Sequence, residues 1–378
     1  MNAVASIGID AISFSTSKYF ISLKKLAFYR NVDYAKYCDG IGQKKMSVFP
    51  PNEDIVTIAI DAAQKVLSKI DKDSIDLLIF ATESSFDLSK SAGLYLHRFL
   101  GLKSDCRVFD IKQACYSTTA ALQMARLFIK SNPKSKVLIV GSDIVKYSPG
   151  SSGEPTQGGA AVAIVMSVNA SILEIEPHSG IHTEDIMDFW RPAKSDEAMF
   201  DGKLSAYNYL KSMNIAFNKY LKKSNLSAAD IDHACFHAPF GKMAIKAARQ
   251  IFPSKDISNT LTYNEVVGNS CSASLYVCLL SLLENTAEDI TGKRIGLYSY
   301  GSGSVAEYFS GIVVAGYEAQ LFLQEHAKML DSRIEISLDE YEKFCNHQFC
   351  IKNFYKNIGN VRLIDIEKGK RIYSKINS

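Results

Sequence analysis

The chain has 378 residues, of which 47% are hydrophobic and 22% are charged, and this composition excludes the disordered and fibrous classes. Its 43 Lys and Arg residues against 40 Asp and Glu residues give a net charge of +3, too small to indicate a nucleic-acid partner. The length is sufficient for one large α/β unit or for two domains that share an interface. Basic residues gather in the last segment, EKGKRIYSKINS, which we expect to be a solvated tail.

The sequence shows no sign of a leader, a membrane span or a metal site. Its start, MNAVASIGIDAISF, lacks the basic residues and long apolar core of a signal peptide, and no apolar run reaches the roughly 18 residues that a membrane span needs. The eight cysteines include no CxxC pair and no Cys/His spacing of the zinc type. We therefore expect a cytoplasmic protein with reduced thiols, no bound metal and no membrane partner.

Strand-like and helix-like segments alternate along the chain, with no low-complexity stretch. The predicted elements are, in chain order, a helix over 54–70, a strand over 75–84, a helix over 117–131, a strand over 135–144, a strand over 231–240, a helix over 242–252, a helix over 269–284 and a strand over 293–304. This alternation predicts an α/β fold.

The spacing of four polar residues indicates an internal duplication. His237 lies 154 residues after Glu83 (237 − 83), and Asn269 lies 154 residues after Cys115 (269 − 115). We therefore expect two similar halves, residues 1–167 and 168–378, that face each other and bring these four residues into one cleft. A stretch near 148–220 has no visible partner in the first half, and we expect it to be an insertion that shapes the cleft.

Cys115 stands where the predicted strand region gives way to the helix over 117–131. The partial positive charge of a helix N-terminus can lower the pKa of a thiol, and the free N–H groups there can hold the oxyanion of an acyl-transfer intermediate. These properties favour Cys115 as a nucleophile. The alternative is a small buried residue, because free cysteine is among the most buried residue types.

Glu83 and His237 each follow an apolar strand run. A carboxyl group at a partly buried strand end has a raised pKa and can act as general acid and base, although Glu83 could also cap a helix. An imidazole between an apolar strand and Pro239 would be held in a fixed orientation, although a lone histidine there can also be a hydrogen-bonded core residue.

The ordered motifs along the chain resemble those of the 3-hydroxy-3-methylglutaryl-CoA synthase family, in its compact bacterial form. They include ATESSFDLSKSA, KQACYSTTAALQMA, SGEPTQGGAAVAIV, TEDIMDFWRP, FHAPFGKM, VGNSCSASLYVCLLSLLEN and LYSYGSGSVAEYFS. The resemblance implies a thiolase-like, five-layered αβαβα fold with two similar halves, and a homodimer. It implies no bound cofactor, because acetyl-CoA and acetoacetyl-CoA are substrates.

Family roles carry over to the matching positions. The resemblance implies that Cys115 takes the acetyl group of acetyl-CoA and that Glu83 deprotonates its methyl group. His237 would orient the ketone of acetoacetyl-CoA, and Asn269 would support the histidine and the thioester oxygens. Backbone N–H groups at Cys115 and Ser304 would hold the oxyanion. Hydrolysis would then release the product.

Four further residues receive binding roles from the same resemblance. Gly301 would let the thioester approach the backbone, although it could also be a simple loop glycine. Tyr147 would lie close to the acyl group, or else pack in the core. Lys242 and Lys246, one helical turn apart, would meet the CoA phosphates, or else form a solvated helix face.

The acyl carrier is left open by the sequence. Ser270 and Cys271 replace the Ile-Tyr pair of many relatives and add a second thiol near the cleft, and HRFLGLKSDCRVFDIKQACYS is closer to synthases that add β-branches to polyketides on acyl carrier protein. GIGQKKMSV, GEPTQGG and FWRP favour CoA. A fatty-acid type ketoacyl synthase would not need Glu83, and a non-catalytic subunit would lack one of the four polar residues.

Overall fold

A single mixed sheet runs through the molecule, which is seen here in a computed structural model that describes residues 6–193, 195, 197–345 and 355–376. Within these residues, nine strands pair in the order β11-β12-β13-β8-β1-β7-β6-β4-β5. Their bounds are β1 (Ile7–Ser15), β4 (Ile75–Ala81), β5 (Arg107–Ile111), β6 (Lys136–Val145), β7 (Gly158–Val168), β8 (Leu173–Thr183), β11 (His233–Phe236), β12 (Arg294–Gly301) and β13 (Val305–Val313).

The sheet consists of two similar halves. In the first half β1, β7 and β6 are antiparallel neighbours, and β4 then runs parallel to β6. The second half repeats this order with β8, β13, β12 and the parallel strand β11. A short antiparallel contact between β1 and β8, at Gly8 with Glu174 and Ile9 with Leu173, joins the halves. The repeated strand order confirms the two similar halves that the 154-residue spacing indicates.

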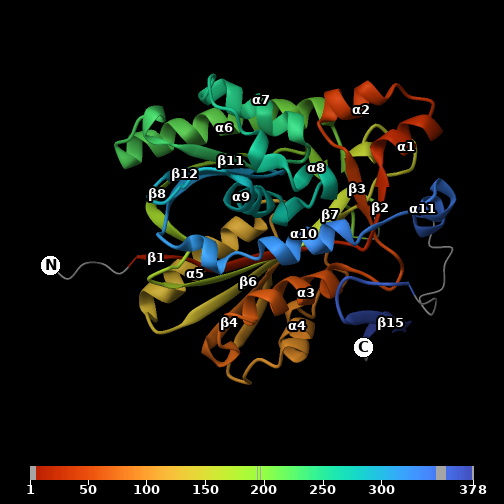
Figure 1. Cartoon of the computed structure of the whole chain (residues 1–378), viewed down its shortest axis with the longest axis horizontal. Helices are drawn as coiled ribbons and strands as arrows, with labels where there is room; N and C mark the ends of the chain where they lie inside the picture. The colour runs from red at the N-terminus through yellow and green to blue at the C-terminus, as the bar shows by residue number, and fades with distance from the viewer. Residues whose placement is uncertain (1–5, 194, 196, 346–354, 377–378) are drawn as a thin grey trace.

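Helices cover both halves and fill the space between them, which gives five layers (Figure 1). Helices α3 (Ile55–Leu67) and α4 (Gly93–Leu100) cover the first half, and α6 (Gly202–Ser224) and α7 (Gly241–Ile251) cover the second. Between the halves lie α5 (Ser117–Ser131) and α9 (Ser274–Asn285). Helix α9 is apolar around nearly its whole circumference, and it is accordingly buried on all sides. The αβαβα fold is therefore confirmed.

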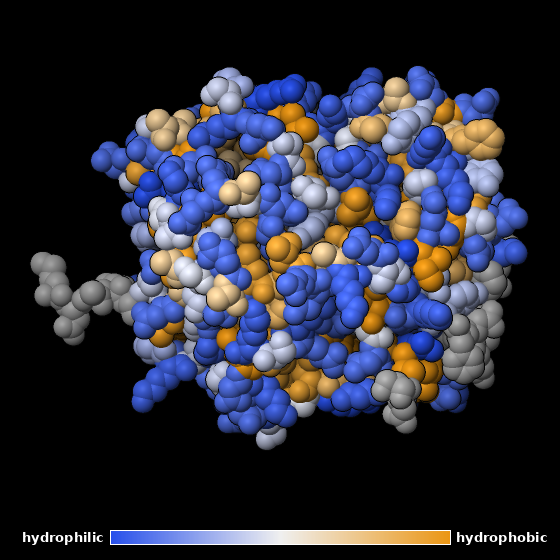
Figure 2. Space-filling view, in the orientation of Figure 1, coloured by the Kyte–Doolittle hydropathy of each residue, from blue (hydrophilic) through white to orange (hydrophobic). Residues whose placement is uncertain are grey.

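Smaller elements complete the described part of the chain. The face seen in Figure 2 is mainly hydrophilic at its rim, and hydrophobic residues show in its middle, near α9 and α10. No helix among the described residues combines the length and the apolar character of a membrane span. The remaining bounds are α1 (Leu23–Tyr29), α2 (Tyr34–Ile41), α8 (Asn264–Val267), α10 (Leu323–Asp331), α11 (Leu338–Cys345), β2 (Tyr19–Ser22), β3 (Lys45–Val48), β9 (Phe189–Trp190), β10 (Met199–Phe200), β14 (Ile334–Glu335), β15 (Val361–Glu367) and β16 (Lys370–Lys375), with short 3-10 helices η1 (Lys72–Ser74), η2 (Glu154–Thr156), η3 (Ala228–Asp230), η4 (Ser258–Leu261), η5 (Cys271–Ala273) and η6 (Tyr317–Gln320).

The expectation of an insertion near 148–220 is wrong for most of that stretch. Strands β7 and β8 lie within it and are central strands of the sheet, and α6 covers the second half as α3 covers the first. Among the described residues between β8 and α6, the regular structure is the short β9–β10 hairpin. This segment supplies Arg191 to the site described below.

The basic C-terminal segment is not simply a solvated tail. Strands β15 and β16 form a hairpin, and the Arg371 guanidinium lies 2.8 Å from Asp54 Oδ2. The buried Tyr373 hydroxyl donates to the same oxygen at 2.7 Å. Because Asp54 caps the N-terminus of α3, the hairpin is anchored to the first half of the fold.

Candidate active site

Cys115 lies in a tight turn between β5 and the first residue of α5, as the sequence predicts. The preceding residue, Ala114, has a φ of +42°, an unusual value for a residue with a side chain. The Ser117 hydroxyl accepts a hydrogen bond from the Gln113 N–H and donates one to the Ala114 carbonyl, both at 2.7 Å. These bonds fix the turn and hold the thiol at the start of the helix.

The second half has an equivalent turn at Asn269. Gly268 precedes it with a φ of +81°, and a Cβ atom at Gly268 would lie 2.1 Å from the Gln157 carbonyl oxygen. The Asn269 Oδ1 accepts the Cys271 N–H at 2.9 Å. Cys271, with a φ of +43°, stands three residues before the start of α9, as Ala114 stands three residues before the start of α5. The duplication therefore extends to the backbone of the two turns, with an offset of 157 residues (271 − 114).

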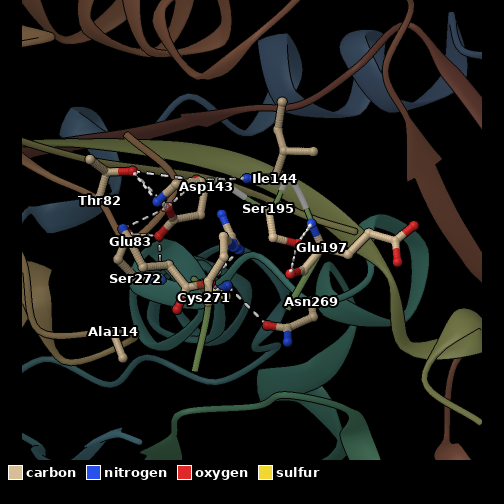
Figure 3. A network of polar contacts seen from close by, with 12 residues as sticks. Thr82, Glu83, Ala114, Asp143, Ile144, Ser195, Glu197, Asn269, Cys271 and Ser272 are labelled. Atoms are coloured by element: carbon tan, nitrogen blue, oxygen red, sulfur yellow. Dashed lines mark hydrogen bonds and ion pairs between the residues drawn. The ribbon is translucent and has the colours of Figure 1, made fainter. Parts of the chain in front are cut away.

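Glu83, Cys115 and Cys271 form a compact cluster where the two turns meet. Figure 3 shows Glu83 and Cys271 of this cluster. One carboxylate oxygen and the two sulfur atoms lie within 4.8 Å of one another, and each is a potential metal-ligand atom. The Cys271 thiol donates to Glu83 Oε1 at 3.1 Å, and Arg191 Nη2 donates to the same oxygen at 3.1 Å. The sequence singles out Glu83 and Cys115, but it gives no role to Arg191.

Asp143, on β6, organises the loop that carries Glu83 (Figure 3). Its Oδ1 accepts the Thr82 hydroxyl at 2.7 Å and the Glu83 N–H at 2.9 Å, and it also accepts the Ser84 hydroxyl. Its Oδ2 accepts the N–H of Ser272 at 3.1 Å and the hydroxyl of that residue at 2.5 Å. Asp143 therefore ties the first-half loop to the second-half turn. Sequence reasoning missed this residue, although an acid at the end of the apolar run VLIVGSD was a visible signal.

The environment of Glu83 makes its carboxyl group a weak acid. Burial is the main cause and the negative charge of Asp143 adds to it, while Arg191 and the Cys271 thiol act in the opposite direction. Together they raise the pKa of Glu83 to about 7. A carboxyl group with this pKa exchanges a proton readily near neutral pH, as general acid–base catalysis requires.

The pKa of Cys115 is raised, contrary to the expectation from its place at a helix start. A hydrogen bond from Cys271 lowers the pKa, but burial and the negative charges of Glu83, Asp143 and Asp188 outweigh it. The resting group is therefore a thiol, surrounded by carboxylates, and not a preformed thiolate.

His237 directly follows β11 and is 3% exposed. The backbone N–H of His237 donates to the Tyr298 carbonyl at 2.8 Å, and the backbone carbonyl of His237 accepts the Tyr209 hydroxyl at 2.6 Å. Burial lowers the pKa of the imidazole to about 3, so the ring is neutral. Its Nδ1 is buried and has no hydrogen-bond partner in the described part of the molecule. The structure thus holds the backbone of His237 and leaves this ring nitrogen without a partner.

Among the described residues, the expected contact of Asn269 with His237 and the expected free N–H of Ser304 are not found, whereas a contact of Asn269 with the thioester oxygens stays a prediction. Asn269 is bonded to the Cys271 backbone, and no hydrogen bond joins its side chain to His237 among the described residues. The N–H of Ser304 donates to the Glu184 carbonyl at 2.6 Å, so it is not a free oxyanion donor. This hydrogen bond is one of a pair between the backbones of Ser304 and Glu184, which lie antiparallel beyond the end of β12.

Gly301 ends β12 against the turn that carries Cys115. A Cβ atom at Gly301 would lie 2.6 Å from the Gln113 carbonyl oxygen and 2.7 Å from the Tyr116 nitrogen. A side chain at position 301 would collide with this turn, so the close approach of β12 to the turn requires a glycine there. The approach of a thioester to Gly301 stays a prediction.

Tyr147 lies in the buried cluster beside the thiols, and the two lysines are on the surface. Tyr147 is buried in a small apolar cluster that includes Cys271 and against which Cys115 packs. This places it beside the two thiols, as the resemblance implies. Lys242 and Lys246 lie exposed on α7, so their side chains can meet a ligand only outside the buried cluster.

Comparison with known proteins agrees with this geometry. The family model described as hydroxymethylglutaryl-coenzyme A synthase N terminal matches residues 4–171, and the C-terminal model matches residues 173–256 and 241–365. A hydroxymethylglutaryl-CoA synthase of Enterococcus faecalis is 44% identical over 89% of this chain and 91% of its own length. The polyketide biosynthesis 3-hydroxy-3-methylglutaryl-ACP synthase PksG of Bacillus subtilis (strain 168) is 34% identical, over 90% of this chain and 88% of its own. A crystal structure of an HMG-CoA synthase complexed with CoA superposes with a TM-score of 0.94 at 36% identity, covering 98% of this chain and all of that one. The chain therefore belongs to the hydroxymethylglutaryl-CoA synthase family.

Proposed function

We propose that this chain is an acyltransferase that condenses an acetyl group carried by Cys115 with the ketone of acetoacetyl-CoA. The observation that carries the proposal is the position of Glu83, whose carboxyl group lies within 4.8 Å of the Cys115 sulfur and has a pKa of about 7. Removing a proton next to a thioester carbonyl requires a base of raised pKa beside the acyl group. Glu83 meets both conditions.

The reaction has three steps on these residues. Cys115 attacks the carbonyl carbon of acetyl-CoA, the C–S bond to CoA breaks, and the thiol proton leaves with CoA. Glu83 then removes a methyl proton, and the resulting carbanion adds to carbon 3 of acetoacetyl-CoA. The ketone oxygen takes up the proton that Glu83 removed and becomes a hydroxyl group, which returns Glu83 to its ionised form. Water finally cleaves the thioester bond to Cys115 and releases 3-hydroxy-3-methylglutaryl-CoA. The second step accounts for the glutamate, which acyl transfer alone would not require.

His237 acts as a neutral hydrogen-bonding group in this proposal. With a pKa of about 3, its imidazole is uncharged at neutral pH and carries one N–H group. A neutral imidazole can orient and polarise the acceptor ketone without giving up a full proton. The unpartnered Nδ1 supports this role, because a buried polar atom is normally hydrogen-bonded. The backbone N–H of Cys115 is the oxyanion donor that we propose.

Mass spectrometry tests the proposal directly. Acetyl-CoA alone should add one acetyl group to the peptide that contains QACYSTTAALQ, and acetoacetyl-CoA should then release it as 3-hydroxy-3-methylglutaryl-CoA. The variant Cys115→Ala should acquire no acetyl group, whereas Cys38→Ala should behave like the parent. An acetyl group found on Cys271 would show that the nucleophile is wrongly assigned.

A second candidate function uses acyl carrier protein in place of CoA. It is favoured by the 34% identity to a 3-hydroxy-3-methylglutaryl-ACP synthase. The exposed Lys242 and Lys246 favour CoA, because cations on α7 can meet its phosphates. CoA would place the product in the mevalonate route to isoprenoids, and the carrier protein would place it in polyketide β-branching.

A competition between the two carriers decides this point. The chain is given CoA-bound and carrier-protein-bound forms of both the acetyl donor and the acetoacetyl acceptor, and the products are identified by mass. We expect the CoA forms to react faster. A preference of more than about tenfold for both protein-bound substrates, near 1.4 kcal/mol, would make this a β-branching synthase.

We also propose a cytoplasmic homodimer without resident cofactor or nucleic-acid partner, with halves divided near 167/168. Two features support the dimer: β5 is an edge strand of the sheet formed by the described residues, and Met124 and Leu127 on α5 are 50% and 62% exposed. The free cysteines among the described residues support a reducing compartment. Light scattering on the purified chain measures the oligomeric state, and a monomeric mass would contradict the dimer.

A further inference from the structure

We infer that Glu83, Cys115 and Cys271 form a binding site for a thiophilic divalent cation of the Zn²⁺ class, and that an ion bound there blocks the active site. The inference goes beyond the proposed reaction, which needs no metal. It departs from the sequence-based expectation of no metal site. That expectation considered local spacing, whereas these ligands are 32 (115 − 83) and 156 (271 − 115) residues apart.

The positions of the three donor atoms suit such an ion. Zinc binds thiolate sulfur at about 2.3 Å and carboxylate oxygen at about 2.0–2.2 Å, so two sulfurs of a tetrahedral site lie about 3.8 Å apart and a sulfur and an oxygen about 3.5 Å apart. Here the Cys271 sulfur lies 3.1 Å from Glu83 Oε1, and all three donors lie within 4.8 Å of one another. Side-chain movements of about 1 Å or less would bring them to these distances, and the fourth position would take water.

The charge around the cluster also favours a cation. The carboxylates of Glu83, Asp143 and Asp188 all act on the Cys115 thiol, and the Arg191 guanidinium opposes them at Glu83. Thiol and carboxyl groups give up their protons when they bind a metal ion. A divalent ion would replace those protons and offset the negative charge.

The surrounding structure holds two of the ligands in place (Figure 3). Asn269 Oδ1 accepts the Cys271 N–H, and Asp143 Oδ1 accepts the Glu83 N–H, both at 2.9 Å. Such bonds to the ligand backbones reduce the cost of assembling a metal site. Arg191 acts against binding because it occupies Glu83 Oε1, so the ion must displace it or use the other carboxylate oxygen.

Occupancy would disable two catalytic groups at once. A Cys115 thiolate bound to the ion cannot attack a thioester, and a coordinated Glu83 carboxylate is a poor base. Because Cys271 provides one of the three ligands, the sensitivity to the ion depends on a thiol that the proposed reaction does not use. The site would therefore make the enzyme reversibly sensitive to free zinc.

Cobalt provides a probe that does not depend on turnover. The full chain, reduced and freed of metal by a chelator, is titrated with Co²⁺, whose thiolate complexes absorb in the near ultraviolet and whose tetrahedral complexes absorb in the visible. We expect one equivalent to bind with both bands, more tightly at higher pH because protons are displaced, and to be removed by Zn²⁺. Cys271→Ser should weaken binding by at least about tenfold, and Glu83→Gln should weaken it while keeping the thiolate band.

Two matched variants and a second readout complete the test. Cys38→Ser, a partly exposed thiol on α2, and Cys350→Ser, which lies outside the described residues, should bind like the parent. Saturating Zn²⁺ should slow alkylation of Cys115 by iodoacetamide at least about tenfold, measured by mass, and a chelator should restore it. Circular dichroism and thermal unfolding verify that each variant is folded. The inference is overturned if the parent shows no thiolate band, if folded Cys271→Ser binds as tightly as the parent, or if Zn²⁺ leaves the alkylation rate unchanged.

Discussion

Glu83 and His237 stand at equivalent strand ends in the two halves of the molecule. Glu83 follows β4 and His237 follows β11, and both side chains are largely shielded from solvent. Burial is the main cause of the pKa shift in each case, but it acts in opposite directions. It raises the pKa of the acid to about 7 and lowers that of the base to about 3, because a buried site disfavours the charged form of either group.

The two sites differ in what surrounds the titrating atoms. Glu83 has Arg191 and Cys271 on its carboxylate and Asp143 beneath its backbone, so its charge can be adjusted by neighbours. His237 is held through backbone bonds, and its Nδ1 has no partner within the described structure. One duplicated scaffold therefore provides a proton-exchanging group on one side and a fixed neutral group on the other. The predictions below test this division of roles.

The largest effect is expected for Glu83→Gln. The amide keeps the shape of the side chain but cannot accept a proton, so condensation should fall by at least about 10²-fold, which is a usual contribution of proton transfer. Acetylation of Cys115 should continue, since that step needs no base at the methyl group. Single-turnover mass spectrometry separates the two steps, and an equal loss in both would contradict the role of Glu83.

His237→Gln should chiefly affect the acceptor. Loss of one oriented hydrogen bond is expected to weaken use of acetoacetyl-CoA by about tenfold, near 1.4 kcal/mol. Acetylation by acetyl-CoA in the absence of acceptor serves as the internal control and should be nearly unchanged. Full turnover with unaltered acceptor affinity would remove His237 from the mechanism.

Asp143→Asn sharpens the comparison by removing one negative charge on the glutamate side while keeping the size of the side chain. The negative charge of Asp143 raises the pKa of Glu83, so its removal should lower that pKa and extend condensation to lower pH. We expect the acidic limb of the pH–rate profile to move down by about one pH unit. Asp188→Asn is the matched control, because Asp188 acts on the pKa of Cys115 and not on that of Glu83. An unmoved limb in Asp143→Asn would argue against this coupling.

The smallest effect is a pair of opposite stability changes with pH. The folded-state pKa of Glu83 is above its ordinary value of 4.5, so its contribution to stability is present below about pH 4.5 and is lost as the pH rises through about 7. The folded-state pKa of His237 is below its ordinary value of 6.5, so its contribution is present above about pH 6.5 and is lost as the pH falls toward about 3. Both statements concern the free energy of unfolding.

Denaturant unfolding at several pH values measures these changes. As the pH rises from mildly acidic to mildly alkaline, the free energy of unfolding of Glu83→Gln should increase by about 1 kcal/mol relative to that of the parent chain. As the pH is lowered, the free energy of unfolding of His237→Gln should increase by a similar amount relative to the parent. Cys38→Ser should follow the parent at every pH. Parallel curves for all chains would mean that neither group titrates differently in the folded and unfolded states.

The sequence by itself determined the local elements and their repetition. The apolar spacing over 117–131 coincides with α5, the run over 75–84 contains β4, and the run over 135–144 covers all of β6 except its last residue. Local sequence predicts these elements because the period of burial is set by neighbouring residues. The 154-residue spacing correctly linked the strand ends at Glu83 and His237, although the two turns are offset by 157 residues, the distance between the first residues of α5 and α9 (274 − 117). It could do so because duplicated halves keep their functional residues at the same places along the chain.

Only the tertiary structure decided which side chains surround the reacting groups. Asp143, Arg191 and Cys271 reach Glu83 from segments that are 60, 108 and 188 residues away in sequence. The pKa of Cys115 shows the consequence. A helix start alone predicts a lower pKa, but burial of the thiol and the negative charges of nearby carboxylates raise it. Electrostatic interactions depend on distance and burial in space, so they cannot be read from the order of residues along the chain.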